Sequence, residues 1–109
     1  MKVQEIIEKL NLTAENIADG EREIKSCYCG DFLSFSISRQ GDSCIWLTVM
    51  NNVNVAGVAT LTDCALIVLC EGTRPDEALK ARAQASGINI ARTDMSVYDT
   101  AVAFYLATK

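Results

Sequence analysis

Five cysteines and the absence of histidine limit the chemistry that this chain could perform. Without histidine there is no Ser-His-Asp or Cys-His nucleophile, no Cys2His2 zinc site and no HExxH metalloprotease site. Cys27 and Cys29 are two residues apart, so on a strand both thiols share one face and could serve a metal, an iron–sulfur cluster or a redox reaction. Cys64 and Cys70, by contrast, end one apolar run, about 20 Å apart at about 3.3 Å per residue. We therefore expect packed, free thiols, no metal site and no cofactor, with Cys29 and Cys70 as an alternative redox-sensing pair.

The sequence carries no phosphate-binding motif of a catalytic domain. Neither GxxxxGK[ST] nor GxGxxG occurs, which argues against a P-loop kinase and against a dinucleotide-binding Rossmann unit. The paired carboxylates Glu21/Glu23 and Asp76/Glu77 fit a turn and a helix start better than a general acid and base. We therefore predict that the chain is not an enzyme.

Length and composition indicate one folded unit. With 109 residues, 50% of them hydrophobic and 22% charged, the chain fits a single domain that spans residues 1–109. Its formal net charge is −4 without any cluster of Lys or Arg, so neither nucleic acid nor a membrane is an expected partner. The N-terminus lacks the apolar stretch of a signal peptide, and the longest apolar run, 64–70, is far shorter than the roughly 20 residues that cross a bilayer. We expect a cytoplasmic protein whose odd number of thiols does not form a disulfide framework.

The apolar pattern predicts alternating strands and helices. An amphipathic helix begins the chain and ends near Asn11, and a turn at Asp19-Gly20 forms a small hairpin or tight loop before the first predicted strand. The 64–70 run, apolar without alternation, indicates a strand covered on both faces. The order predicts an α/β single-domain sandwich, with a mostly parallel sheet of about four to five strands flanked by helices. The predicted strands are 24–29, 43–49, 64–70 and 88–91, and the predicted helices are 32–35, 51–62, 75–86 and 93 to the end.

Polar residues follow the carboxyl ends of the predicted strands, where ligands bind in open parallel sheets. Two guanidinium groups among them suit a phosphate or carboxylate. For ligand binding we select Asp31, Asn52, Arg74, Arg92 and Thr93. The complete predicted rim comprises Asp31, Thr48, Asn51, Asn52, Thr73, Arg74, Arg92, Thr93, Asp94 and Ser96.

Each of these residues also has a purely structural interpretation. Asp31 is equally suited to cap the helical turn that follows it, and Arg74 and Arg92 are equally suited to lie in solvent. Trp46, inside a strand, fits the core or a dimer interface better than a platform for stacking a ligand. The candidate N-caps of the later helices are Asn51 or Asn52, Thr73, and Thr93 or Asp94, and Gly87 is the expected end of the helix that starts near Pro75.

Nearly the whole chain resembles the DRTGG domain family. The resemblance lies in the amphipathic start 1–10, the stretch 21–34, the strand after Gly41 and the ending 93–101. Arg22 and Asp31 match the family motif, whereas Ser26-Cys27 stands where the family has paired glycines. Such domains occur alone, beside CBS pairs and within some phosphotransacetylases. They are similar to the N-terminal domain of HPr kinase/phosphorylase, and the resemblance does not extend to its P-loop kinase domain.

The resemblance implies an α/β sandwich that self-associates and has a regulatory role. Stand-alone members lie near hydrogenase-type genes in anaerobic bacteria, which implies an accessory or sensing role. From the polar rim and the resemblance together, we expect a non-catalytic regulatory homodimer that binds a small anionic ligand such as a nucleotide. The alternative is a protein-interaction accessory subunit without a ligand, in a redox system of the hydrogenase type. A thiol-based redox or iron–sulfur enzyme is the third interpretation.

Overall fold

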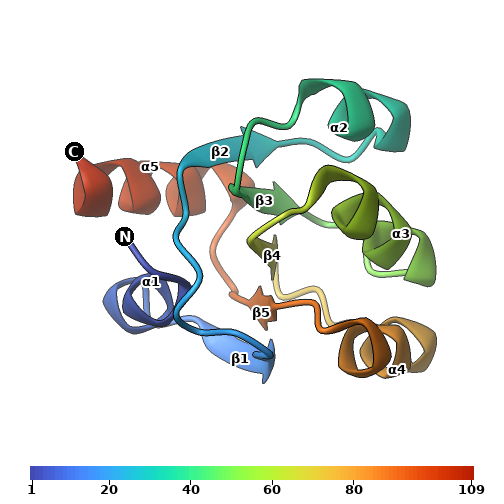
Figure 1. Ribbon diagram of the computed structural model, residues 1–109. Coiled ribbons are helices and arrows are strands. Elements are labelled where there is room, and N and C mark those ends of the chain that lie inside the picture. Colours follow the sequence, from blue (N-terminus) through green and yellow to red (C-terminus); the bar gives the residue numbers. More distant parts are fainter.

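Four apolar segments form the parallel part of one five-stranded sheet in the computed structural model, which describes all residues, 1–109. β2 (Ser26–Cys29) pairs with β3 (Cys44–Thr48), β3 with β4 (Leu66–Leu69), and β4 with β5 (Ile90–Arg92). β1 (Thr13–Asn16) runs antiparallel to β5 on its other side, so the strand order is β1-β5-β4-β3-β2. The mostly parallel α/β sheet expected from the sequence is confirmed (Figure 1).

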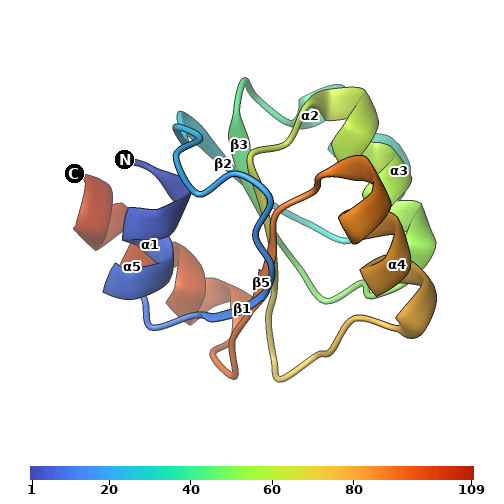
Figure 2. The same ribbon diagram turned by 60° about the horizontal axis from the view of Figure 1, so that its bottom comes forward.

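Helices cover both faces of this sheet. α2 (Leu33–Arg39), α3 (Val53–Thr62) and α4 (Glu77–Ser86) each connect two neighbouring parallel strands, and all three lie on one face (Figure 1). α1 (Val3–Lys9) and α5 (Val97–Thr108) pack against each other on the opposite face, as the turned view in Figure 2 also shows. Each of the three connections leads to the next strand in the same direction across the sheet. Because crossover connections between parallel strands have the same handedness, the three helices lie on one face. None of the helices combines the length and the apolar character that crossing a bilayer requires.

Two apolar cores fill the space between the sheet and its helices. Side chains alternate along the strands, so Ile45 and Leu47 join the core under α1 and α5, whereas Trp46 joins the core under α3 and α4. Every residue of β3 and β4 is buried, which confirms that the continuous apolar run at 64–70 forms a strand covered on both faces. Trp46 is fully buried and therefore belongs to the core.

The segment before β2 has the tight loop that was one of the two alternatives at Asp19-Gly20, with the N–H of Arg22 donating to the carbonyl oxygen of Asp19 at 3.5 Å. It does not form the other alternative, a hairpin, because β1 and β2 lie at opposite edges of the sheet. The chain leaves β1 at Asn16, beside Ile90 at the amino end of β5, and crosses the amino ends of the parallel strands to enter β2. β1 itself was not predicted, because its mostly polar residues at a sheet edge show no apolar alternation.

The start of α4 also differs from the prediction. Asp76 is its N-cap, because Asp76 Oδ1 accepts a hydrogen bond from the backbone N–H of Leu79 at 2.8 Å. Thr73, the predicted cap, belongs instead to the preceding turn, in which its N–H donates to the carbonyl oxygen of Cys70 at 3.1 Å. The predicted end is confirmed, since Gly87 adopts a left-handed conformation with φ 67° at the C-cap.

The start of α5 was predicted at Thr93 or Asp94 but lies further along the chain. Ser96 is the N-cap, and its hydroxyl accepts a hydrogen bond from the N–H of Asp99 at 2.9 Å. Thr93 closes a shorter turn before the helix and leaves Asp94 exposed. The predicted cap of α3 is confirmed at Asn52.

Asn89 fixes the segment that leads from β1 toward β2. Its Oδ1 accepts hydrogen bonds from the N–H groups of Ala18 at 2.8 Å and Asp19 at 3.0 Å. Its Nδ2 donates to the carbonyl oxygens of Asp19 at 2.9 Å and Ala65 at 3.0 Å. The residue is 5% exposed, and the four bonds use the full capacity of an amide side chain. One buried side chain thus joins the loop after β1 to the start of β4.

Arg22 is a structural residue at the amino end of the sheet. Its Nη1 and Nη2 donate to Oδ1 and to the backbone carbonyl oxygen of Asp63 at 3.1 and 2.6 Å, and its Nε donates to Ser43 Oγ at 3.3 Å. Asp63 is the left-handed C-cap of α3. Arg22 therefore joins the loop before β2 to the end of α3, at the edge opposite the polar rim.

Candidate functional site

At the carboxyl ends of β2 and β3, Asp31 connects two loops. Asp31 Oδ1 accepts hydrogen bonds from Thr48 Oγ1 at 2.6 Å and from the N–H of Val49 at 2.9 Å. Asp31 does not cap α2, because the residue at the N-cap position is Phe32 and no side chain caps this helix. The carboxylate of Asp31 therefore holds the loops after β2 and β3 together.

The loops after β3 and β4 are joined in the same way. Asn51 Nδ2 donates to the carbonyl oxygen of Arg74 at 2.8 Å, and the N–H of Asp76 donates to the carbonyl oxygen of Asn51 at 3.1 Å. The side-chain oxygen of Asn52 accepts from the N–H of Asn54 at the start of α3. The side chain of Arg74 is exposed and makes no hydrogen bond within the chain.

After β4 the chain turns to α4 on one face of the sheet, and after the neighbouring β5 it turns to α5 on the other face. Open α/β sheets often form a ligand crevice between two such strands. Here the two loops bond to each other. The N–H of Glu71 donates to the carbonyl oxygen of Met95 at 2.8 Å, and the N–H of Gly72 donates to that of Thr93 at 3.0 Å. Positive φ values of 62° and 73° at Glu71 and Gly72 turn the chain into this arrangement. The crevice is thereby closed.

A cavity of about 380 Å³ remains at the end of the rim beside β1. It lies where the carboxyl end of β5 meets the start of the antiparallel β1, because Thr13 pairs with Arg92. Its volume is at the lower end of the range of small-molecule sites. The end of α1, β1, β5 and the loop before α5 contribute its lining residues, which are Leu10, Asn11, Thr13, Arg92, Thr93, Asp94 and Met95.

Arg92 is the functional group that distinguishes this cavity. Its Nε donates to Glu15 Oε2 at 3.3 Å, and the two side chains are 20% and 17% exposed. The two Nη groups donate no hydrogen bond within the chain, so four N–H donors remain for a ligand. Thr93 next to it is buried, and its Oγ1 accepts from the N–H of Met95 at 3.2 Å.

The charges around the cavity favour a ligand of mixed polarity. Arg92 is its one lining cation, Asp94 contributes a carboxylate, and Glu15 partly neutralises the guanidinium. Asn11 and Thr13 add an amide and a hydroxyl without charge. One anionic group can pair with the free side of Arg92. A second anionic group near Asp94 would meet repulsion, whereas a hydroxyl or amino group could donate to it.

Of the five residues selected from the sequence, the structure brings Arg92 and Thr93 together at the cavity. Asp31, Asn52 and Arg74 lie elsewhere along the carboxyl edge, and the first two have partners that account for them structurally. The rule that ligands bind beyond the carboxyl ends of parallel strands therefore identifies one half of the cavity. It also selects residues whose role is to hold loops together.

The sequence pattern does not predict the residues that line the other half of the cavity. Leu10 and Asn11 follow α1, and Thr13 begins β1, so they lie far from the parallel strands in sequence. The one local feature in this segment is Asn11, an asparagine at the end of an amphipathic helix. It takes a left-handed conformation with φ 54°. That signal predicts the end of the helix and not a ligand site.

The structure gathers no group of three or more Cys, Asp or Glu side chains that could hold a metal ion. Burial raises the pKa of Cys44 to about 11 and that of Cys64 to about 12. Burial also raises the pKa of Cys70. These three thiols stay protonated at neutral pH and are therefore poor nucleophiles.

Comparisons with known proteins bear on the fold. No protein-family profile matches the chain, and no curated protein matches it. Among solved structures, the chain is similar to the CBS and DRTGG domains of the regulatory region of Clostridium perfringens pyrophosphatase, crystallised with its activator diadenosine tetraphosphate, at a TM-score of 0.72 and 12% sequence identity. The likeness covers 92% of this chain and 44% of that one, so the chain spans less than half the length of that structure. The α/β fold is thus shared with part of a regulatory region.

Proposed function

We propose that the chain is a non-catalytic regulatory domain that binds a small anionic ligand of the nucleotide class in the cavity beside β1. The observation that carries this proposal is Arg92, which lies at the cavity with two Nη groups free of intramolecular partners. A guanidinium held in place on one side and open on the other can form paired hydrogen bonds to a phosphate.

A nucleoside monophosphate fits the charges of the cavity better than a polyphosphate. Its single phosphate can pair with Arg92, and its ribose hydroxyls can donate to the exposed carboxylate of Asp94. Each further phosphate would add negative charge beside Asp94 and Glu15 without a second cation in the cavity. The proposed ligand therefore combines one phosphate or carboxylate with several hydroxyl or amino groups.

The similar solved structure supports a regulatory role, because it comes from a regulatory region that is crystallised with a nucleotide activator. We further propose that residues 1–109 form a single domain of the DRTGG type. Arg22 and Asp31 support this assignment, since the matching motif residues both bridge loops of the fold.

Replacement of Arg92 by alanine tests the site. Arg92→Ala is expected to weaken nucleoside monophosphate binding by about 1.5–3 kcal/mol, or roughly 10- to 150-fold, because charge-assisted hydrogen bonds are lost. Isothermal titration calorimetry of the wild type and the variant measures this difference, after circular dichroism has shown that both are folded.

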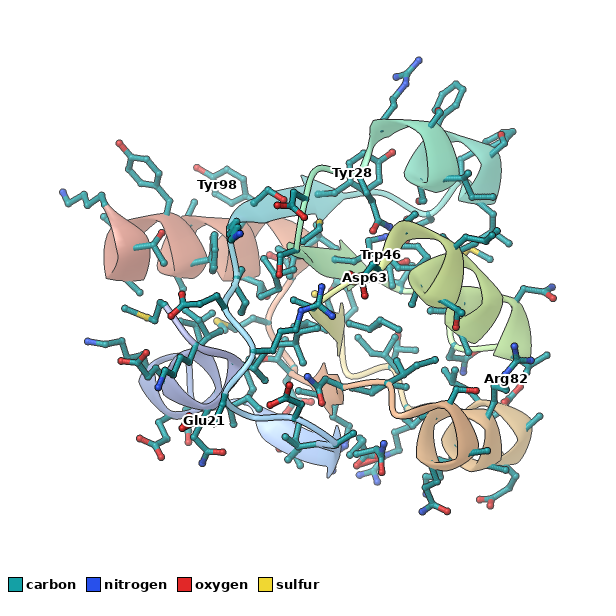
Figure 3. All side chains as sticks on the ribbon, viewed as in Figure 1. Glu21, Tyr28, Trp46, Asp63, Arg82 and Tyr98 are labelled. Carbon is teal, nitrogen blue, oxygen red and sulfur yellow. The ribbon has the colours of Figure 1, made fainter.

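Arg82→Ala is the matched control. Arg82 is exposed on α4, on the other face of the sheet from α1 (Figure 3). It should leave the affinity unchanged. Equal affinities of the wild type and Arg92→Ala would remove Arg92 from the site, and an equal loss in both variants would show a non-specific charge effect.

A second candidate function is protein interaction without a ligand, and the outer face of α5 favours it. Tyr98, Val102, Tyr105 and Leu106 form an apolar stripe at helical spacing, and Tyr98 is 75% exposed (Figure 3). An apolar stripe of this kind on a surface helix is typical of an interface. We propose a second copy of the chain as its partner.

The double variant Tyr98→Glu/Tyr105→Glu tests this interface by light scattering over a wide concentration range. The wild type is expected to dimerise and the double variant to remain monomeric, because charged side chains in an apolar interface cannot be desolvated without cost. Leu61→Glu is the control, since Leu61 is 74% exposed on α3, across the sheet. A monomeric wild type at all concentrations, or a double variant that dimerises as well as Leu61→Glu does, would contradict the assignment.

A further inference from the structure

Cys27 and Cys29 form an exposed pair of thiols at the sheet edge opposite the cavity. β2 is the last strand of the sheet and pairs only with β3, where Cys27 is in register with Ile45 and Cys29 with Leu47. Both cysteines therefore lie on the face that α1 and α5 cover, and both are nevertheless exposed. The fold thus presents two neighbouring thiols to solvent, while Cys44 and Cys70 are buried.

The two exposed thiols are chemically different from each other. The Cys27 thiol, two residues away on the same face of β2, acts as a donor toward Cys29 and lowers the pKa of Cys29 to about 7, against the opposing effect of its partial burial. The neighbouring Cys29 and partial burial raise the pKa of Cys27. Asp99 is the charged residue of α5, which packs against β2, and it forms no hydrogen bond with either thiol. Near neutral pH, Cys29 is therefore thiolate to a greater extent than an ordinary cysteine, whereas Cys27 remains a thiol.

We propose that Cys29 is a modification site that reacts with hydroperoxides, and that Cys27 resolves the product as a disulfide. The Cys29 thiolate attacks one peroxide oxygen, so that an S–O bond forms and the O–O bond breaks. The leaving oxygen takes a proton and departs as water or an alcohol. The Cys27 thiol then loses its proton and attacks Cys29 sulfur, an S–S bond forms, and the S–O bond breaks to release water. The two thiols lose two electrons in total, and the peroxide gains them.

The position on an edge strand gives this reaction a structural consequence. Two residues apart in a strand, the Cα atoms are separated by about 6.6 Å, at the upper limit of about 6.8 Å that a disulfide bridges. Formation of the bond must therefore shorten β2 locally and disturb its pairing with β3. Because β2 has no neighbour on its other side, it can deform without breaking a second pairing. A dithiol reductant should restore the strand, since bonds at the limit of the geometry are readily reduced.

Alkylation of the full chain tests the reactive thiol. With limiting iodoacetamide at pH 7, peptide mass spectrometry is expected to find Cys29 modified before Cys44, Cys64 and Cys70, with a pH midpoint near 7. Cys27→Ala removes the thiol that lowers the pKa of Cys29, so the midpoint should rise toward that of an ordinary thiol and the rate at pH 7 should fall about fivefold. An unchanged midpoint in Cys27→Ala would refute the role of Cys27 in activating Cys29.

Oxidation with one equivalent of hydrogen peroxide, followed by trapping of free thiols and intact-mass measurement, tests the resolving step. The wild type is expected to lose two hydrogens and to regain them with dithiothreitol. Cys27→Ser should instead accumulate a sulfenic acid at Cys29 that dimedone captures, and Cys29→Ser should react much more slowly at Cys27. Circular dichroism checks that both variants are folded. A wild type that forms no internal disulfide, or that is oxidised first at a buried cysteine, would overturn the proposal. Neither result depends on a ligand in the cavity beside β1.

Discussion

Replacement of Asn89 by alanine is expected to lower the free energy of unfolding by about 2–4 kcal/mol, because four backbone groups lose the one buried amide to which they all bond. The N–H groups of Ala18 and Asp19 and the carbonyl oxygens of Asp19 and Ala65 all bond to this one amide. Alanine removes all four bonds and leaves the carbonyl oxygen of Ala65 unpaired in the interior. Urea unfolding followed by circular dichroism measures the change.

Asn54→Ala is the matched control for the Asn89 variant. Asn54 is exposed within α3 and its side chain makes no hydrogen bond, so its loss should change stability by less than about 0.5 kcal/mol. If Asn89→Ala lowered the free energy of unfolding by less than about 1 kcal/mol, close to the effect of this control, the segment after β1 would have to be held by other contacts.

Trp46→Ala is expected to cost about 3–5 kcal/mol, which is the usual range for removal of a large buried aromatic side chain. Trp46 is fully buried in the core under α3 and α4, and its Nε1 donates to the carbonyl oxygen of Gly30 at 2.9 Å. The loss therefore combines a large cavity with an unpaired carbonyl oxygen. Differential scanning calorimetry should show a melting temperature lowered by more than ten degrees.

Trp46→Phe keeps the prediction testable if the alanine variant does not fold. Phenylalanine retains most of the ring but removes the donor to Gly30, so a smaller loss of about 1.5–3 kcal/mol is expected. Leu61→Ala is the control, because Leu61 is largely exposed and should change stability little. A Trp46→Phe variant as stable as the wild type would contradict the packing described for this core.

The sequence predicts the interior of the fold better than its edges. β3 and β4 are covered on both faces, so burial imposes a continuous apolar run that can be recognised without any structure. β1 lies at an edge, is only partly buried, and carries the polar residues Thr13, Glu15 and Asn16. Its strand conformation depends on pairing with β5, far away in the sequence, and no local pattern encodes that pairing.

The candidate site shows the same division between local and long-range information. Arg92 and Thr93 could be selected because a general rule places ligands beyond parallel strands. Asp31 and Arg74 satisfy the same rule, yet the hydrogen bonds between neighbouring loops occupy that part of the edge. Only the strand order decides that the cavity opens beside β1, and the strand order follows from tertiary packing.

The position of Asn89 in the sequence carries a local signal of its structural role. An amide between Ile88 and Ile90, in a segment otherwise apolar enough to be buried, indicates a polar group with internal partners. The sequence cannot name those partners, because Ala18 and Asp19 are about 70 residues away in the chain.

The measurement that tests the central claim most directly is a titration of the isotope-labelled chain with adenosine monophosphate, followed by two-dimensional amide NMR. The account predicts saturable shifts at residues 10–13 and 92–95, which surround the cavity, with inorganic phosphate producing weaker shifts at the same residues and adenosine the weakest. Arg92→Ala should abolish saturation at concentrations that saturate the wild type. An absence of shifts, or shifts confined to residues 48–52 and 71–75, would contradict the account, because the ligand would then be absent or would bind elsewhere on the carboxyl edge.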